Sequence, residues 1–495
     1  MNSYDQFLKQ EDRHLCIKKA VECLTQNREN ACCVKRNYVR DIYDFFTLTE
    51  DESTTKAEAL KININDITNW EKLHDSFIGK KSVSDLSVCY LAGPEPLNDY
   101  TEFINLGILP QNIWSFEMDN SNYAEATRKA SSLSYPMPRV INQKLENFLH
   151  ETPKKFDIIY VDACGSIPSN RHALKCISAI FDNQRINSPG VVISNFAEPD
   201  EQDYLKFNQL ILPYLYFKST NQCYQTLNET VEGLTSKKAI TDFEKFRDNY
   251  SEFISAVMRD IPSVYIPLKR MSYSSYLRPL FDENEQSIKN FTLPEMYEAS
   301  KESSLARFII YCKSLQQLDE RTEIFFKEIV DLDILYKSFC LETLIRNEKI
   351  RFPHKMQAAS FLSANDNLFQ FLDKPHGNIF MDVVINQLVY PMHYVSSENV
   401  RYMYKAKNKW MYSDVTVYDE CRYIYEWLPT MSLMKSIKDQ VSPQYVFRYA
   451  IDGLIKQREQ YNNEFFYQGA VISGNNNDEF SIKRIPKRVN LNERR

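Results

Sequence analysis

Five short apolar runs alternate strictly with helical stretches between about residues 86 and 217, and this alternation restricts the fold more than any other feature. The runs are LSVCYLA (86–92), NIWSFEMD (112–119), PRVINQ (138–143), FDIIYVDA (156–163) and PGVVISNF (189–196). Strands that alternate with helices form a parallel sheet, and they are apolar throughout because helices cover both of its faces. The sequence therefore predicts an α/β fold with a doubly wound, mostly parallel sheet.

The segments on either side of this alternation predict four regions along the chain. They are an N-terminal helical region (1–81), an α/β domain (82–280), a second helical region (281–375) and a β-rich aromatic region with a basic C-terminal tail (376–495). Within the α/β domain we expect a helical insertion at about 220–260. The run SVYIPLKRMSYSSY (263–276) predicts a strand or hairpin that returns to the sheet. The C-terminal half is thus a large mixed helical and β region.

Composition and charge narrow the class of protein. With 495 residues, 43% of them hydrophobic and 25% charged, the chain resembles ordinary globular proteins. The net charge of −6 argues against a protein that coats nucleic acid over its whole surface. No apolar run approaches the roughly 20 residues of a spanning helix, and the polar N-terminus is unlike a signal or transit peptide. We therefore expect a soluble cytoplasmic protein with no membrane partner.

The cysteines and histidines do not predict a metal site. Eleven cysteines are scattered without a CxxC pair, as expected of small buried hydrophobic residues in a reducing compartment. A zinc site at His14, Cys16 and Cys23 lacks a second ligand pair with zinc spacing. The expectation from the sequence is no metal.

Polar residues follow three of the predicted strands at the edge where a parallel α/β sheet binds ligands. That edge is formed by the loops that leave the carboxyl ends of the strands. Gly93 and Pro94 follow the first strand, Glu117 follows the second about 20 residues further on, and Asp162 ends the fourth. This spacing suits an acid that binds ribose hydroxyls. Each residue also has a plain structural interpretation, as a turn or a helix cap.

The order of these pieces resembles the class I S-adenosylmethionine-dependent methyltransferases, over roughly residues 82–217. LAGPEP looks like the family's first loop, IWSFEMD like its second strand with the ribose-binding acid at Glu117, and FDIIYVDACGS like its fourth motif with Asp162 beside the methyl group. The resemblance implies a Rossmann-like domain, S-adenosylmethionine as cofactor and a catalytic role for Asp162. The cofactor-binding residues it implies are Ala92, Gly93, Pro94, Glu95, Glu117, Lys144 and Asp162.

The sequence also departs from the family's pattern. Glu95 and Pro96 replace further glycines of the first loop, and the Glu95 carboxylate could meet the cofactor's ammonium group instead. Lys144 stands where many members have an adenine-binding acid. The aromatic residue that stacks on a target base in amino-methylating relatives is absent, because Ala163 and Cys164 follow Asp162. These departures also fit a domain that has lost catalysis.

A stretch near the C-terminus, VRYMYKAKNKWMYSD (400–414), alternates cations with aromatic rings. Aromatic faces stack on unpaired bases and nearby cations meet phosphates, so the stretch suggests a site for single-stranded nucleic acid. The alternative is an antiparallel hairpin with its rings in the core and its lysines in solvent. The nucleic-acid-binding residues of the first interpretation are Arg401, Tyr402, Tyr404, Lys405, Lys407, Lys409, Trp410 and Tyr412.

Two functions of different classes follow. The first is an S-adenosylmethionine-dependent methyltransferase whose acceptor is a nucleic acid or a protein, with specificity supplied by the C-terminal half. The second is a catalytically silent, nucleotide-sensing or scaffold subunit of a larger assembly, either oligomeric or in a complex. The departures from the family's pattern at Glu95, Pro96 and Lys144 favour the second function. The presence of the family's acid at Asp162 favours the first.

Overall fold

The computed structural model describes a little over half of the chain. The described residues are 7–48, 54–134, 136–163, 165–167, 172–200, 243–273, 390, 392–406, 408–427, 440–458 and 486–494, with the single positions 301, 304, 307, 342 and 345. Their contacts divide the chain into two compact units. The first comprises residues 1–162, 184–195 and 392–495, and the second comprises 163–183 and 196–391. Both units are discontinuous in sequence, whereas the four regions predicted from the sequence are consecutive.

The first unit is built on one nine-stranded sheet. The predicted strands are present as β1 (Val88–Leu91), β2 (Ile113–Phe116), β3 (Val140–Ile141), β4 (Phe156–Asp162) and β5 (Ile186–Ala197). These five pair in parallel, in the order β3-β2-β1-β4-β5. This order is that of a Rossmann-like doubly wound sheet. The predicted fold class, α/β with a mostly parallel sheet, is confirmed.

A helix connects each of these strands to the next, as the alternation predicts. The helices are α5 (Leu97–Asn105), α6 (Asn120–Ala130), α7 (Leu145–Glu151) and α8 (His172–Asp182). At the start of α6 the Asp119 carboxylate accepts hydrogen bonds from the backbone N–H groups of Ser121 and Asn122, which fixes where the helix begins. The direction in which strands are added reverses between β1 and β4, which is where open α/β sheets bind ligands.

Strands from the C-terminal region extend the same sheet. They are β6 (His393–Tyr394), β7 (Val400–Ala406), β8 (Lys409–Asp419) and β9 (Val489–Asn490), and the path continues β5-β8-β7-β9, with β6 also paired to β8. β7 and β8 form an antiparallel hairpin. The Thr416 hydroxyl donates a hydrogen bond of 2.9 Å to the Val192 carbonyl, which joins β8 to β5. The aromatic stretch is therefore part of the central sheet.

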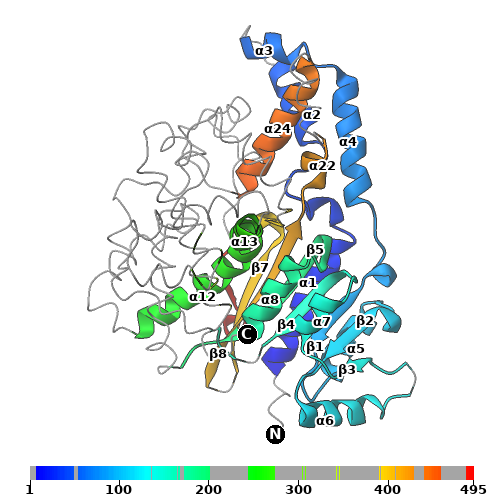
Figure 1. The fold of residues 1–495 in the computed structure, drawn as a ribbon, viewed down its shortest axis with the longest axis vertical. Coiled ribbons are helices and arrows are strands. Elements are labelled where there is room, and N and C mark those ends of the chain that lie inside the picture. The colour runs from blue at the N-terminus through cyan, green and yellow to red at the C-terminus, as the bar shows by residue number, and fades with distance from the viewer. Residues whose placement is uncertain are drawn as a thin grey trace. The chain divides into compact units, whose positions relative to one another are not determined.

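The N-terminal helices pack with C-terminal helices at one end of this unit. α2 (Tyr38–Leu48), α3 (Thr54–Ala59) and α4 (Ile64–Ile78) gather with α22 (Arg422–Tyr425) and α24 (Val441–Arg458) at the top of Figure 1. α1 (Phe7–Leu24) instead contacts β7, β8 and α5. Trp70 of α4 is fully buried and its indole N–H donates to the Tyr423 carbonyl at 3.1 Å, so the first and last parts of the chain share one core.

In the second unit, the run expected to return as a strand is helical. α12 (Phe243–Asp260) continues through a π-helical turn (Ile261–Tyr265) into α13 (Ile266–Ser272). The buried residues Ile261, Tyr265 and Ile266 repeat at helical rather than alternating spacing. Short apolar runs fit both patterns, so the strand prediction is wrong for residues 263–272. No helix in the described part of the chain is long and apolar enough to span a membrane.

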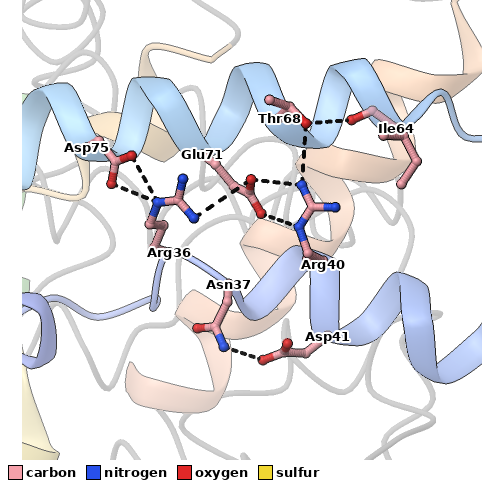
Figure 2. A network of polar contacts seen from close by, with 8 residues as sticks. All are labelled: Arg36, Asn37, Arg40, Asp41, Ile64, Thr68, Glu71 and Asp75. Carbon is pink, nitrogen blue, oxygen red and sulfur yellow. Dashed lines mark hydrogen bonds and ion pairs between the residues drawn. The ribbon is translucent and has the colours of Figure 1, made fainter.

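A network of charged side chains holds α2 against α4 (Figure 2). The Glu71 carboxylate, 3% exposed, accepts two hydrogen bonds from the Arg40 guanidinium, at 2.6 and 2.8 Å. Arg36 lies 3.8 Å from the same carboxylate and donates to both oxygens of Asp75 at 2.9 Å. The paired, fork-shaped contact with Arg40 is the strongest type of ion pair in proteins.

Glu71→Ala is expected to lower the free energy of unfolding by roughly 1–3 kcal/mol, because Arg40 loses both charge-assisted hydrogen bonds at a buried position. Asp75→Ala on the same helix is the matched control. The Asp75 side chain is 52% exposed, so its loss should cost no more than about 1 kcal/mol. Guanidinium denaturation of both variants measures the difference, and equal effects would contradict the special role of Glu71.

Candidate cofactor site

The strand register brings four predicted strand ends to one level. Leu91 pairs with Phe116 and Tyr90 pairs with Tyr160, so Ala92 lies level with both Glu117 and Asp162. Asp162 in turn pairs with Asn195 of β5. Neighbouring strands are about 4.8 Å apart, so these residues form a row along the carboxyl edge of the sheet.

The loop after β1 leaves its backbone open to close contact with a ligand. Gly93 has φ of +57°, a conformation that strains any residue with a Cβ, and no atom of the described residues lies within 4 Å of where a Cβ would stand. The Tyr90 hydroxyl donates to the Pro96 carbonyl at 2.7 Å and anchors the end of the loop. Ala92 is buried, and Pro94 is partly exposed. This loop can accommodate a ligand beside Gly93.

Glu95 has a different role from the one suggested by the sequence. Its carboxylate lies 2.5 Å from the Lys129 ammonium group, and Lys129 also pairs with Glu125 at 2.7 Å. These contacts tie the loop after β1 to α6. The idea that Glu95 meets the cofactor's ammonium group gains no support from this geometry, because a lysine already neutralises the carboxylate.

Glu117 follows β2 and is partly exposed at the carboxyl edge. Its backbone N–H donates to the Ile141 carbonyl at 3.0 Å, which fixes the backbone at the end of β2. One side-chain oxygen accepts the backbone N–H of Asp119 at 2.7 Å. Asp119, not Glu117, caps α6, so the plain interpretation of Glu117 as a cap does not hold. The second carboxylate oxygen can accept hydrogen bonds from a pair of hydroxyl groups.

Lys144 stands at the N-cap of α7, at the same edge of the sheet. Phe116 pairs with Ile141, so the turn from β3 to α7 begins level with Glu117. Lys144 is exposed, and its side chain does not cap the helix. The family resemblance implies a contact with adenine at this position, but an ammonium group there cannot accept a hydrogen bond from an adenine amine.

Asp162 is held by residues from opposite ends of the chain. Its carboxylate lies 3.0 Å from the Lys9 ammonium group of α1, and the Asn195 amide donates to it at 3.3 Å. The same amide donates to the Tyr404 hydroxyl of β7 at 3.1 Å. The carboxylate is thereby oriented at the end of β4.

A second carboxylate, Asp12 of α1, belongs to the same cluster. It is fully buried and shares a hydrogen bond of 2.6 Å with the Ser413 hydroxyl, which also lies 3.2 Å from the Asn195 amide oxygen. Burial, and to a lesser extent the charge of Asp162, raises the pKa of Asp12 to about 7, against the opposing effect of the Ser413 hydrogen bond. Two carboxyl groups with different environments thus lie at one edge of the sheet.

Arg13 on the next position of α1 crosses to α5. Its guanidinium donates to Asp99 at 2.6 Å, and both side chains are buried. Burial alone would lower the pKa of Arg13, but Asp99, Tyr160 and Asp162 outweigh it and raise the pKa above its ordinary value. The helix α1 is therefore bound to the carboxyl edge of the sheet by Lys9, Asp12 and Arg13.

Sequence reasoning missed the residues that surround Asp162. They are Lys9, Asp12, Arg13, Asn195 and Ser413, whereas Tyr404 is expected from the sequence only as a contact for nucleic acid. Asn195 gave a weak signal, as a polar residue inside the apolar run VVISNF. Lys9, Asp12 and Arg13 gave none, because a charged residue in a helix is ordinarily exposed. Ser413 gave none, because its partner Asp12 lies 401 positions away in sequence.

The hairpin residues are not arranged as a row of stacking rings. Tyr402, Tyr404 and Tyr412 are buried, at 8%, 0% and 5% exposure. Arg401 is also buried and lies 4.0 Å from Asp414. The expectation that these four meet nucleic acid is corrected, because buried rings and a buried guanidinium present no face to a base or phosphate. The alternative, a hairpin packed into the core, describes them.

The remaining hairpin residues differ from these four. Lys405 and Lys409 are exposed, and Trp410 is partly exposed. Lys405 and Trp410 are paired across the two strands. Lys407 lies outside the described residues. Among the described residues of the predicted nucleic-acid site, therefore, Lys405, Lys409 and Trp410 face solvent.

Comparisons with known proteins match solved structures over part of the chain. No protein-family model and no curated protein matches the sequence. Among solved structures, an S-adenosylmethionine-dependent methyltransferase from Clostridium acetobutylicum is 18% identical and covers 31% of this chain and 56% of its own, with a TM-score of 0.18.

Two further matches are of the same class. An rRNA methylase from Streptococcus thermophilus is 15% identical over 29% of this chain and 76% of its own, with a TM-score of 0.19. PKMT2 from Rickettsia typhi, in complex with AdoHcy, is 12% identical over 56% of this chain and 50% of its own, with a TM-score of 0.20. Similarity this low carries no argument about activity, which must come from the geometry of the site.

Proposed function

We propose that the protein binds S-adenosylmethionine at the carboxyl edge of β1, β2 and β4 and transfers its methyl group to a nucleophilic acceptor. The observation that carries the proposal is the level row formed by Ala92, Glu117 and Asp162, with the open backbone of Gly93 beside it. Three features of the family resemblance thereby meet at one edge.

The residues of this edge fit the cofactor in two respects. A glycine with positive φ, and with no neighbour among the described residues within 4 Å of its missing Cβ, allows a ligand to lie against the backbone. The free oxygen of Glu117 can accept hydrogen bonds from ribose hydroxyls. When bound, S-adenosylmethionine supplies a methyl group already activated by its sulfonium.

The protein's own contribution is then binding and alignment. Glu117 holds the ribose of the cofactor. The loop that contains Gly93 positions the part of the cofactor next to the ribose. Asp162, oriented by Lys9 and Asn195, holds the acceptor in line with the methyl group or takes its proton. Alignment of two reactants can account for a large share of a rate enhancement.

A nucleic acid is one acceptor class within this proposal, and a protein is the other. Exposed Lys405 and Lys409 beside Trp410 support a weak contact with single-stranded nucleic acid. The burial of the neighbouring tyrosines removes most of the stacking surface that favoured it.

One observation favours the second function, a nucleotide-sensing or scaffold subunit without turnover. Asp162 and Glu95 are each paired with a lysine of the same chain, Lys9 and Lys129. Carboxylates used in this way can be structural. Binding of the cofactor without methyl transfer to any protein or nucleic-acid acceptor would support this alternative.

Glu117→Ala is expected to weaken binding of S-adenosylhomocysteine by roughly 1–3 kcal/mol, because the ribose loses charge-assisted hydrogen bonds. The matched control is Glu125→Ala, which removes the same charge from an exposed position on α6 and should leave affinity unchanged. Equilibrium dialysis measures both. Equal affinity of the Glu117 variant and the parent for every adenosine ligand would show that Glu117 does not hold the ribose.

A further inference from the structure

Two cysteines and an aspartate from opposite ends of the chain meet in the core of the first unit. Cys33 follows the first 3-10 turn (Arg28–Asn30), whereas Asp419 ends β8 and Cys421 precedes α22. One ligand atom from each, two thiol sulfurs and a carboxylate oxygen, lie within 4.8 Å of one another, and all three residues are buried. Cys33 and Asp419 are 386 positions apart in sequence, so no motif with regular ligand spacing predicts this cluster.

The separations fit a tetrahedral metal ion. Zinc–sulfur distances of about 2.3 Å and zinc–oxygen distances of about 2.1 Å place sulfur and oxygen about 3.6 Å apart at the tetrahedral angle. The Cys421 sulfur lies 3.6 Å from Asp419 Oδ2. The Cys33 and Cys421 sulfurs lie within 4.8 Å of each other.

The aspartate is held as metal-binding carboxylates usually are, by hydrogen bonds around it. Oδ1 accepts the backbone N–H of Cys421 at 2.9 Å and the Ser188 hydroxyl at 3.0 Å. Oδ2 accepts the backbone N–H of Cys33 at 2.9 Å and the Tyr423 hydroxyl at 2.6 Å. The Tyr423 hydroxyl is itself fixed by the Val34 N–H at 3.0 Å. The carboxylate is therefore oriented before any ion binds.

We propose that Cys33, Asp419 and Cys421 bind a thiophilic divalent ion of the zinc class, with a water molecule in the fourth position. The complete burial of the three residues makes the site structural rather than catalytic, since catalytic sites keep a position open to substrate. The ion would fasten the segment after α1 to the end of β8. This site is separate from the row at Ala92, Glu117 and Asp162.

Ion binding at this cluster competes with protons on the two thiols. A metal ion deprotonates the thiols that coordinate it, so binding releases protons and strengthens as the pH rises.

The probe is cobalt(II), added to the full chain after chelation and under reducing conditions. Thiolate coordination of cobalt produces a strong sulfur-to-metal absorption in the near ultraviolet, and zinc should abolish it by displacement. We expect this band in the parent protein, and loss of most of it in Cys33→Ser and in Cys421→Ser. Cys89→Ser is the matched control, because Cys89 is an equally buried thiol inside β1 outside the cluster; it should retain the band.

A second measurement guards against variants that fail to fold. Zinc should raise the melting temperature of the parent, because an ion that binds only the folded chain stabilises it by mass action. A parent protein with neither a thiolate–cobalt band nor a zinc-dependent rise in melting temperature would overturn the proposal. So would a band that persists when Cys33 and Cys421 are both serine.

Discussion

Asp162→Asn is expected to lower the rate of methyl transfer by roughly 10²–10⁴-fold, the usual contribution of a positioned acid or base. The amide keeps the shape of the carboxylate but cannot take a proton and loses its ion pair with Lys9 at 3.0 Å. Binding of S-adenosylhomocysteine should change little, because the ribose contact belongs to Glu117. Steady-state transfer of labelled methyl to the acceptor, with binding measured separately, checks both statements.

Asp157→Asn is the matched control on the same strand. Asp157 lies at the opposite, amino end of β4 and is likewise paired with a lysine, Lys81, at 2.6 Å. Its substitution should lower stability but leave the specific activity of the folded protein unchanged. If Asp162→Asn lowers stability as Asp157→Asn does and leaves transfer intact, Asp162 is a structural residue and the silent-subunit function gains support.

Asp12→Asn is expected to stabilise the protein at alkaline pH relative to the parent. The folded carboxyl has its pKa raised by burial to about 7, against an ordinary value of 3.8. Between these values the folded state keeps a proton that the unfolded chain has lost, so stability of the parent falls as the pH rises through this window. Each pKa unit is worth about 1.4 kcal/mol, so the variant should gain roughly 2–3 kcal/mol relative to the parent between about pH 5 and pH 8.

Asp119→Asn provides a control of opposite sign. Hydrogen bonds from Ser121 and Asn122 lower the pKa of this exposed carboxyl, so its contribution is present at neutral pH and is lost as the pH falls. Its variant should therefore lose stability relative to the parent toward neutral pH, where Asp12→Asn gains. Denaturant midpoints across the pH range give both comparisons. A pH-independent difference between parent and Asp12→Asn would mean that Asp12 is ionised in the folded state.

The α/β sheet could be predicted because its signals are local. Apolar runs such as FDIIYVDA, followed by helical stretches, predict parallel strands, and the order of the runs places Glu117 and Asp162 at the carboxyl edge. The level row of Ala92, Glu117 and Asp162 then required only the register between neighbouring strands. Local pattern was misleading at residues 263–272, where an apolar run fits a helix as well as a strand.

Contacts between distant parts of the chain could not be predicted. The pairing of β8 with β5 makes the hairpin an inner part of the sheet and buries Tyr404, which its alternation with lysines had suggested was exposed. Lys9 and Asp12 look like ordinary charged positions of an exposed helix until α1 is placed against the sheet. The cluster at Cys33 and Cys421 has the same origin.

The central claim is a cofactor site at the carboxyl edge of β1, β2 and β4, and calorimetric titration of the full chain with S-adenosylhomocysteine tests it most directly. This ligand binds without turnover, so the result does not depend on the acceptor or on catalysis. We expect one site per chain with micromolar affinity, weakened at least several-fold by Glu117→Ala and unchanged by Glu125→Ala. Absence of binding to both S-adenosylhomocysteine and S-adenosylmethionine, by a protein shown to be folded, would contradict it.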